Sequence, residues 1–414
     1  MKRKLIAIIA AMAMAMFAMF GFAGCSSSDD DSTTEEETTE EETTEEEEES
    51  TDEEESTDDD QAAADEVAAL IDAIYVQERT DETDEQCTEA KEAWDALTDE
   101  QKELVEGEYA DPDYFGLDTG DASADDPLND DDIGENEILV VSFGTSFNDS
   151  RVASIGAIES AIQEAYPDWS VRRAFTAQII INHIQARDGE YIDNVEQALD
   201  RAVDNGVVNL VVQPTHLMHG AEYDELVETL EGYEDQMNIT IAEPLLGEVG
   251  DDATVINEDK VTVADAVVAA AAEDAGYADA AEAAEDGVAI VLMGHGTSHT
   301  ANVTYSQMQT VMEEQGYDNV FIGTVEGEPE GTACEDVIAT VEEAGYTDVI
   351  LRPLMVVAGD HANNDMAGDD DDSWLSQFEA SGSFDSVTCQ ITGLGELETI
   401  QQLYVEHLSE VIDE

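Results

Sequence analysis

Two histidines in the second half of the chain, His295 and His361, have side chains that could bind a divalent metal ion. A neutral imidazole is a common metal ligand and also accepts protons near neutral pH. The chain contains two similar halves, and their alignment puts His295 opposite Phe143 and His361 opposite Glu222. We therefore expect the second half to carry the reactive groups and the first half to position a substrate.

Short apolar runs, each followed by turn residues, must position these histidines. The run 138–143 ends in Gly144-Thr145-Ser146, and its counterpart at 288–293 ends in Gly294-His295-Gly296. A second matching pair lies at 207–214 and 347–353. Continuous apolar runs of this length are typical of buried parallel strands.

Amphipathic stretches separate these runs, at 153–165, 195–203, 305–314 and 334–343. Alternation of strands and helices predicts an α/β protein with parallel sheets covered by helices on both faces. The similarity of the halves predicts two doubly wound lobes, about 135–250 and 285–414. Open sheets of this kind bind ligands at the carboxyl ends of their strands, so we expect a cleft between the lobes.

Four motifs carry a resemblance to a known family. They are SFGTS at 142–146, MGHGTSHTAN at 293–302, TVEG at 324–327 and GDHANNDMAGDDDDSW at 359–374, and AFTAQIII at 174–181 is a fifth match. On these motifs, residues 138–408 resemble the anaerobic sirohydrochlorin cobaltochelatases, class II chelatases that share their fold with ferrochelatase. The resemblance implies an enzyme that inserts a divalent metal into a tetrapyrrole. Cobalt is the expected metal, iron and nickel are alternatives, and no organic cofactor is expected.

The resemblance places the metal site on His295, Glu326 and His361. Two imidazoles and a carboxylate suit a borderline divalent ion and leave coordination positions open for pyrrole nitrogens. Insertion removes two pyrrole protons, and His295 is the expected base. Asp365 and Asp369 to Asp372 are expected to support a metal-bound histidine or to fix the loop. Taken singly, a His or Glu after a strand is more often a structural or surface residue, so the motifs together carry this assignment.

The charge of the chain raises a difficulty for a tetrapyrrole that carries several carboxylates. The 103 Asp and Glu against 13 Lys and Arg give a net charge of −90. Such a field excludes nucleic acid as a partner and keeps a protein soluble at high salt. Local basic groups must therefore receive the substrate. The predicted substrate-binding residues are Arg172, Arg173, Ser142, Gly144 and Thr145, with Arg352 as a further candidate.

The amino-terminal residues predict export. Residues 1–25 combine a charged start, an apolar run and a small-residue ending at Cys25, which resembles a bacterial lipoprotein signal; a retained transmembrane helix is the weaker alternative. We expect a lipid on Cys25 that anchors the protein outside the cell membrane. Residues 26–60 predict a disordered acidic tether, 61–110 a small helical segment and 111–134 a linker.

Some alternatives stay open. The four cysteines form no CxxC pair, although a bridge between Cys334 and Cys389 is compatible with their spacing. A homo-oligomer is also compatible with the sequence. Export favours a second hypothesis, in which a chelatase fold captures tetrapyrrole or metal at the cell surface without catalysis. A third hypothesis is a two-lobed solute receptor, which would have no clustered metal ligands.

Overall fold

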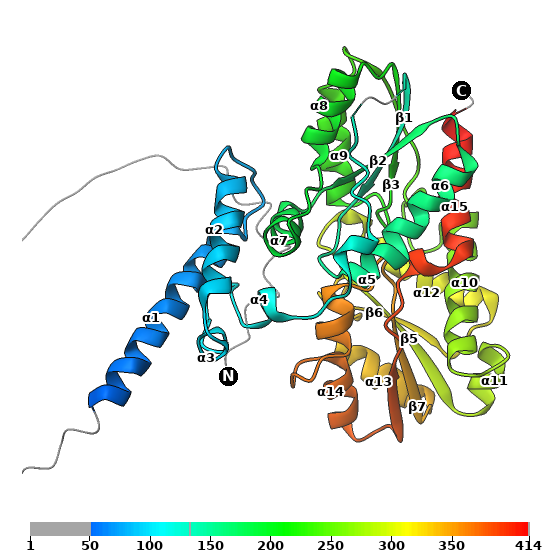
Figure 1. Ribbon diagram of the computed structural model, residues 1–414. Helices are drawn as coiled ribbons and strands as arrows, with labels where there is room; N and C mark the ends of the chain where they lie inside the picture. Colours follow the sequence, from blue (N-terminus) through cyan, green and yellow to red (C-terminus); the bar gives the residue numbers. More distant parts are fainter. Residues whose placement is uncertain (1–50, 132–133, 413–414) are drawn as a thin grey trace, which may run out of the picture.

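The computed structural model describes residues 51–131 and 134–412 and contains two four-stranded parallel sheets, one in each lobe (Figure 1). The first sheet has the order β2-β1-β3-β4 and the second β6-β5-β7-β8, so the two halves share one topology. The strands of the first lobe are β1 (Asn136–Ser142), β2 (Ser170–Phe175), β3 (Asn209–Pro214) and β4 (Asn238–Ile241). Those of the second lobe are β5 (Val288–Gly294), β6 (Val320–Thr324), β7 (Asp348–Pro353) and β8 (Ser386–Cys389). The prediction of two similar α/β lobes is confirmed.

Burial follows the position of each strand in its sheet. Every residue of the central strand β5 is buried, as are all but the first of β1, because helices cover both sheet faces. The edge strands β4 and β8 have only four residues each, and these alternate between exposed and half-buried. The continuous apolar runs in the sequence therefore correspond to the central strands.

Helices cover both sheets. In the first lobe they are α5 (Asn148–Arg151), α6 (Ala157–Ala165), α7 (Gln178–Asp188), α8 (Val195–Asn205) and α9 (Ala221–Glu231). The remaining helices are α10 (Glu258–Asp274), α11 (Ala280–Glu285), α12 (Val303–Gln315), α13 (Cys334–Ala344), α14 (Trp374–Ser381) and α15 (Glu398–Ile412). The predicted helix 153–165 is interrupted, because a π-helical turn at Val152–Gly156 precedes α6.

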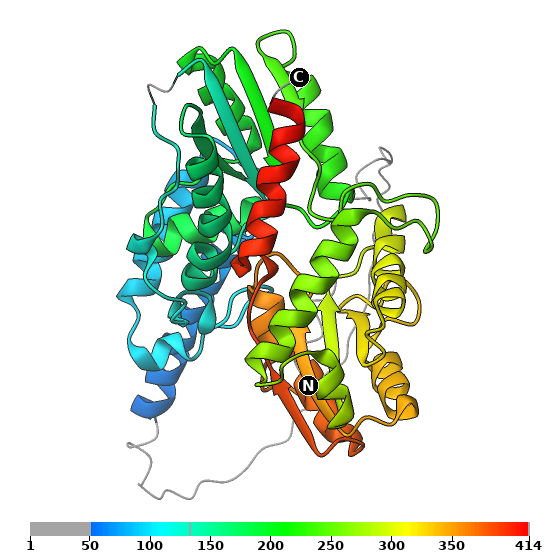
Figure 2. The same ribbon diagram turned by 90° about the vertical axis from the view of Figure 1, so that its right-hand side faces the viewer.

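The last helix of each half packs on the other lobe. The helix α10 follows β4 of the first lobe, yet Ala271 in α10 accepts a 3.0 Å hydrogen bond from Gln390 of the second. The helix α15 ends the second half and lies along the first lobe (Figures 1 and 2), where the Tyr404 hydroxyl donates to the carbonyl of Thr215 over 2.9 Å. The helix α15 therefore packs on the first lobe, although it lies within the range 285–414 predicted for the second.

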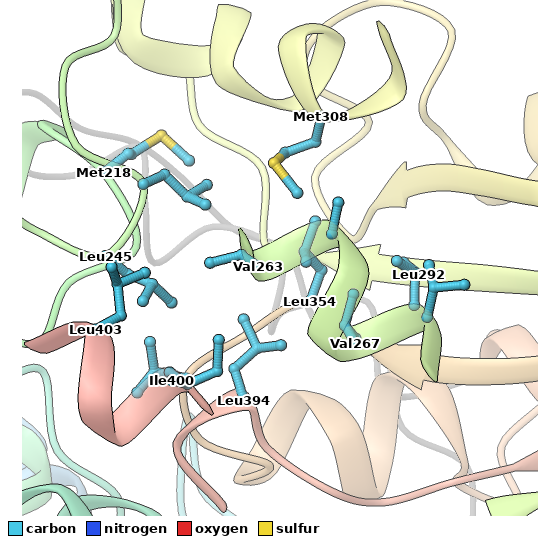
Figure 3. Close-up of a cluster of buried hydrophobic side chains, with 14 of the residues drawn as sticks. Met218, Leu245, Val263, Val267, Leu292, Met308, Leu354, Leu394, Ile400 and Leu403 are labelled. Carbon is cyan, nitrogen blue, oxygen red and sulfur yellow. The ribbon is translucent and has the colours of Figure 1, made fainter. Parts of the chain in front are cut away.

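One apolar core joins the lobes through these exchanged helices. Side chains from first-lobe loops, α10, the second sheet and α15 meet in it, as Figure 3 shows. Its labelled members are Met218, Leu245, Val263, Val267, Leu292, Met308, Leu354, Leu394, Ile400 and Leu403. Each such buried side chain stabilises the fold by about 1.5–3 kcal/mol. The lobes thus share a core, unlike those of a receptor whose lobes are joined only by a hinge.

A helical module of residues 51–116 precedes the lobes, with α1 (Thr51–Ile74), α2 (Thr83–Ala96), α3 (Asp99–Lys102) and α4 (Asp113–Gly116). Ile71, Ile74 and Trp94 are among the buried side chains of its small core. The predicted tether 26–60 is wrong at its end, because α1 begins at Thr51. Acidic residues favour the first turns of a helix, which accounts for this extension.

The predicted linker 111–134 includes residues 125–131, which pack on the first lobe instead of spanning solvent. Asp125 is 2% exposed at its side chain and accepts 2.6 Å hydrogen bonds from Arg151 and Arg173. Burial alone would raise the pKa of Asp125, but these two guanidinium groups hold it below its usual range. The polar composition that predicted a linker did not reveal these partners, which lie in the folded domain.

The predicted export signal and the lipid-bearing Cys25 lie outside the described residues. No helix in residues 51–131 or 134–412 combines the length and the apolar character needed to cross a bilayer. Cys334 and Cys389 are both free thiols, so the bridge that their spacing left open is not formed.

Candidate metal centre

The rings of His295 and His361 lie against each other at the carboxyl ends of β5 and β7. Their centroids are 4.6 Å apart and their planes make an angle of 73°. Nδ1 of His295 lies 2.7 Å from the carbonyl oxygen of Gly296, and Nδ1 of His361 lies 2.6 Å from Oδ2 of Asp365. The structure therefore brings together the two histidines that the sequence singled out.

Two glycines fix the turn that carries His295. A Cβ on Gly294 would lie 2.3 Å from the ring of Tyr305, so only glycine fits there. Gly296 has φ +91°, a conformation that side chains with a Cβ rarely adopt, and its N–H donates to the Tyr305 hydroxyl over 3.1 Å. The ring and the hydroxyl of Tyr305 therefore hold this turn in place. The sequence analysis assigned no role to Tyr305.

Glu326 lies beside His295. Its backbone N–H donates to the His295 carbonyl over 2.9 Å, and its charge acts on the pKa of both histidines. Among the described residues, however, another group has possible metal-ligating atoms that all lie within 4.8 Å of one another. Its members are Asp360, His361 and Asp365. The sequence analysis expected Asp365 beside a histidine but missed Asp360. The sequence could have indicated Asp360, because this residue directly precedes His361 in the GDHANND motif.

The two histidines have opposite pKa shifts. Burial, reinforced by the nearby His361, lowers the pKa of His295. Burial also acts to lower the pKa of His361, but the hydrogen bond and charge of Asp365, with the charges of Asp360 and Glu326, raise it overall. His295 is therefore a neutral imidazole near neutral pH, whereas His361 is the more basic of the pair. Neighbouring groups whose pKa values are driven apart are typical of acid–base sites.

Acidic residues of the first lobe act on this part of the second lobe. The ring of Phe143, which follows β1, is 46% exposed. Glu222 at the start of α9 adds its negative charge to the field at His295, and His299 pairs with Asp224 of α9 across the lobes at 3.3 Å. Both ring nitrogens of His216 are buried without a hydrogen-bond partner, and burial lowers its pKa to about 4. Acidic residues at the start of α9 therefore lie close to this part of the second lobe.

The SFGTS motif shapes the first-lobe turn. Ser142 is buried and accepts a 2.7 Å hydrogen bond from Thr215. Gly144 has φ +101°, and a Cβ there would meet the Phe175 ring at 2.5 Å. Thr145 is also buried and lies against Gly359 of the second lobe. These three residues hold the turn and the lobe contact in place, and their predicted binding of substrate stays a prediction.

The arginines predicted to receive the substrate already have protein partners. Arg173 is 1% exposed and makes paired hydrogen bonds of 2.6–2.9 Å to Glu159 and to Asp125. Arg172 donates to the carbonyls of Asp130 and Val171. Arg352 is buried and pairs with Asp274 at 2.6 Å. The structure therefore assigns Arg173 and Arg352 to buried ion pairs rather than to substrate, because a buried guanidinium requires a carboxylate close by.

The duplicated parallel sheets and the histidine pair at the carboxyl ends of β5 and β7 define a two-lobed α/β metal chelatase. The chain belongs to the cobalt chelatase (CbiK) family, whose model matches residues 136–413. This membership confirms the resemblance seen in the sequence and the chelatase class of the enzyme.

Two relatives are named as sirohydrochlorin cobaltochelatases. The protein of Salmonella typhimurium is 34% identical over 277 residues, which cover 67% of this chain and 96% of the relative. The Nitratidesulfovibrio vulgaris protein is 29% identical over 280 residues, 66% of this chain and 90% of the relative. Among solved structures, the SirB protein of Bacillus subtilis with Fe3+ is 15% identical with a TM-score of 0.45, over 67% of this chain and 95% of that one.

Proposed function

We propose that this protein inserts cobalt into sirohydrochlorin or a closely related tetrapyrrole, with His295 as the base and with His361 as a metal ligand. The observation that carries the proposal is the contact between the two imidazoles at the carboxyl ends of β5 and β7, at 4.6 Å between centroids. Two relatives that cover two thirds of the chain carry the name of this activity.

The hydrogen bonds of the two histidines divide their roles. A carbonyl oxygen only accepts, so Nδ1 of His295 carries a hydrogen and Nε2 keeps its lone pair. The Asp365 carboxylate fixes His361 in the same tautomer. Each ring therefore offers Nε2. His295, whose pKa is lowered, takes a pyrrole proton, and His361 holds the ion, so no lone pair serves both purposes.

Insertion releases two pyrrole protons for each divalent ion that enters the ring, which conserves charge. The carboxylates of Asp360, Asp365 and Glu326 stabilise the incoming cation next to His361. As the ring nitrogens replace protein ligands, the ion passes to the macrocycle. Because imidazole and carboxylate also suit Fe2+ and Ni2+, these ions are alternative substrates.

The location of the enzyme is part of the proposal. A lipid on Cys25 would hold the protein on the outer side of the cell membrane, and the acidic residues after it would separate the lobes from the bilayer. The tetrapyrrole would then be met outside the cytoplasm.

The test is to mix the purified protein with sirohydrochlorin and Co2+ and to follow the absorbance change against an uncatalysed control, with Fe2+ and Ni2+ in parallel. Faster insertion than in the control supports the chelatase. Tight binding of the ring with no acceleration would instead support a surface protein that captures tetrapyrrole.

A further inference from the structure

A turn of the first lobe contacts the second-lobe loop that leads to His361. The first-lobe turn consists of residues 144–151, which follow β1 and include α5, and the His361 loop consists of residues 358–361, which follow β7. The Ser150 hydroxyl donates to the carbonyl of buried Ala358 over 2.8 Å. A hydrogen bond therefore joins the two lobes three residues before the histidine.

A second contact lies one residue closer to the histidine. A Cβ on Gly359 would lie 2.8 Å from Oγ1 of Thr145, so the loop and the first-lobe turn leave no room for a side chain there. The Gly359 carbonyl accepts hydrogen bonds from the backbone N–H groups of Ala362 and Asn363 over 3.2 and 3.1 Å, and from the Asn363 side chain over 2.8 Å. Because these bonds bracket His361, a displacement of Gly359 would also displace the histidine.

The first-lobe turn is itself held by several hydrogen bonds. Fully buried Arg151 donates from Nη1 to the Thr145 carbonyl over 3.1 Å and from Nε to Asp125 over 2.6 Å. The Asp149 N–H donates to the Thr119 carbonyl over 2.9 Å. Thr119 and Asp125 precede the residues that match the chelatase family, which begin at 136. The chain outside the family domain therefore helps to fix the turn that supports the loop.

The position of the His361 loop matters for metal binding. His361 begins a π-helical turn, His361–Met366, and such turns are rare and frequent at functional sites. A metal ligand must be held within about 0.5 Å of its productive position, and loss of a group that supports a ligand commonly weakens metal binding by about tenfold to a hundredfold. Contacts at the start of the turn can therefore set the affinity of the site.

We propose that the first-lobe turn positions His361 for metal binding, through the hydrogen bond of Ser150 to Ala358 and the contact of Thr145 with Gly359. Ser150 and Thr145 are positioning residues in this role, because they act on the ion through the loop. The inference rests on the proposed role of His361 as a metal ligand. It adds that a metal site built on the second lobe depends on the first.

The experiment titrates the full-length protein with Co2+ in the absence of tetrapyrrole. The visible absorption of bound Co2+ gives the Kd and reports the coordination of the ion, and thermal unfolding without metal measures stability. Ser150→Ala removes the hydrogen bond, and Ser150→Thr keeps the hydroxyl. The matched control is Ser160→Ala, because the exposed Ser160 hydroxyl donates over 2.7 Å to a carbonyl within the first lobe. His361→Ala serves as the reference for loss of the site.

The Gly359 contact is tested by a variant and its relief from the other lobe. Gly359→Ala places a Cβ against Thr145, and the double variant Gly359→Ala/Thr145→Ala removes the Oγ1 atom that this Cβ would meet. An effect confined to the backbone of the loop would not be relieved by a change in the first lobe. Relief therefore distinguishes positioning across the lobes from a local effect at Gly359.

We expect Ser150→Ala to raise the Kd for Co2+ about threefold to tenfold, the range for loss of one hydrogen bond, while Ser150→Thr and Ser160→Ala stay close to wild type. Gly359→Ala should raise the Kd about tenfold or more, and the double variant should return to within about threefold of wild type. The absorption of bound Co2+ should change in the two weakened variants. A merely structural role would lower the unfolding temperature and leave the Kd and the absorption unchanged.

A wild-type Kd in both Ser150→Ala and Gly359→Ala overturns the inference, and if Gly359→Ala does not fold, a wild-type Kd in Ser150→Ala does so. A loss in Gly359→Ala that the double variant does not relieve contradicts the role of Thr145. If His361→Ala loses Co2+ while the other variants keep it, only this inference fails. If His361→Ala binds Co2+ as wild type does, the proposed metal site fails and the inference fails with it.

Discussion

Nδ1 of His361 and Oδ2 of Asp365 lie 2.6 Å apart, four residues along the same π-helical turn. Because a carboxylate on Nδ1 fixes the tautomer and raises the basicity of the ring, Asp365 prepares Nε2 of His361 as a metal ligand. The loop that follows contains further acids, and of these Asp371 is exposed. Metal binding can therefore be compared between a substitution of Asp365, which contacts His361, and one of Asp371, which is exposed.

Asp365→Asn should weaken Co2+ binding by about tenfold to a hundredfold, the range for loss of a carboxylate that supports a ligating histidine. A Co2+ titration without tetrapyrrole measures this effect. Asp371→Asn removes the same charge from the loop that follows the turn and should change the affinity little. Equal losses in both variants would show that only the net charge of the loop matters.

His295→Ala should leave a folded protein that binds the tetrapyrrole but inserts metal at close to the uncatalysed rate. Removal of a general base typically costs on the order of a hundredfold to ten-thousandfold in rate. His361→Ala should instead lose Co2+ affinity. Normal turnover in His295→Ala, Glu326→Ala and His361→Ala alike would refute the chelatase site.

Asp125→Ala should destabilise the protein by about 3–5 kcal/mol, since it leaves Arg151 and Arg173 buried without that carboxylate. Chemical denaturation measures the free energy of unfolding. Asp131→Ala is the control, because Asp131 is 73% exposed in its pair with Arg201 and its loss should cost less than about 1 kcal/mol. A chain that begins at residue 135 lacks Asp125 and should be destabilised in the same way. Similar stabilities for the two variants would contradict the buried role of Asp125.

Glu137 should make the protein less stable as the pH rises. Burial raises its pKa from 4.5 to about 7, so between these values the folded state keeps a proton that the unfolded state has lost. The contribution of Glu137 to the free energy of unfolding is therefore largest below pH 4.5, and it falls as the pH rises to about 7. Glu137→Gln should then be more stable than wild type at pH 8 by about 3 kcal/mol, from roughly 1.4 kcal/mol per unit of pKa.

The measurement is denaturant unfolding of wild type and Glu137→Gln at pH 5 and pH 8. The gain in the free energy of unfolding from Glu137→Gln should be smaller at pH 5, because wild-type Glu137 is protonated there in the folded state. Exposed Glu135→Gln, two residues away, should show no such pH-dependent gain. A gain of the same size at both pH values would mean that the Glu137 proton is not involved.

Cys25→Ala should abolish lipid attachment. Mature wild-type protein should begin at a lipid-modified Cys25 and partition with membranes, because the residues before it have the pattern predicted for an export signal. The variant should remain unprocessed or be released. Mass spectrometry of the mature amino terminus decides the question, and an intact Met1 on mature wild-type protein would contradict the lipoprotein prediction.

The sequence by itself determined the duplicated α/β class and the position of the reactive histidines. Strands that are buried on both faces must be continuously apolar, so β1 and β5 were visible as runs of hydrophobic residues. Because each run ends in a tight glycine turn, the residues that follow it, such as His295, were assigned to the carboxyl edge.

Only the tertiary structure decided which residues meet across long separations. The side chain of Arg173 looks like a substrate ligand until Asp125 and Glu159 are seen around it, and α15 belongs to the second half by sequence but packs on the first lobe. Local patterns encode burial and turns because these depend on neighbouring residues, whereas partners of buried charges and of exchanged helices depend on how the whole chain packs.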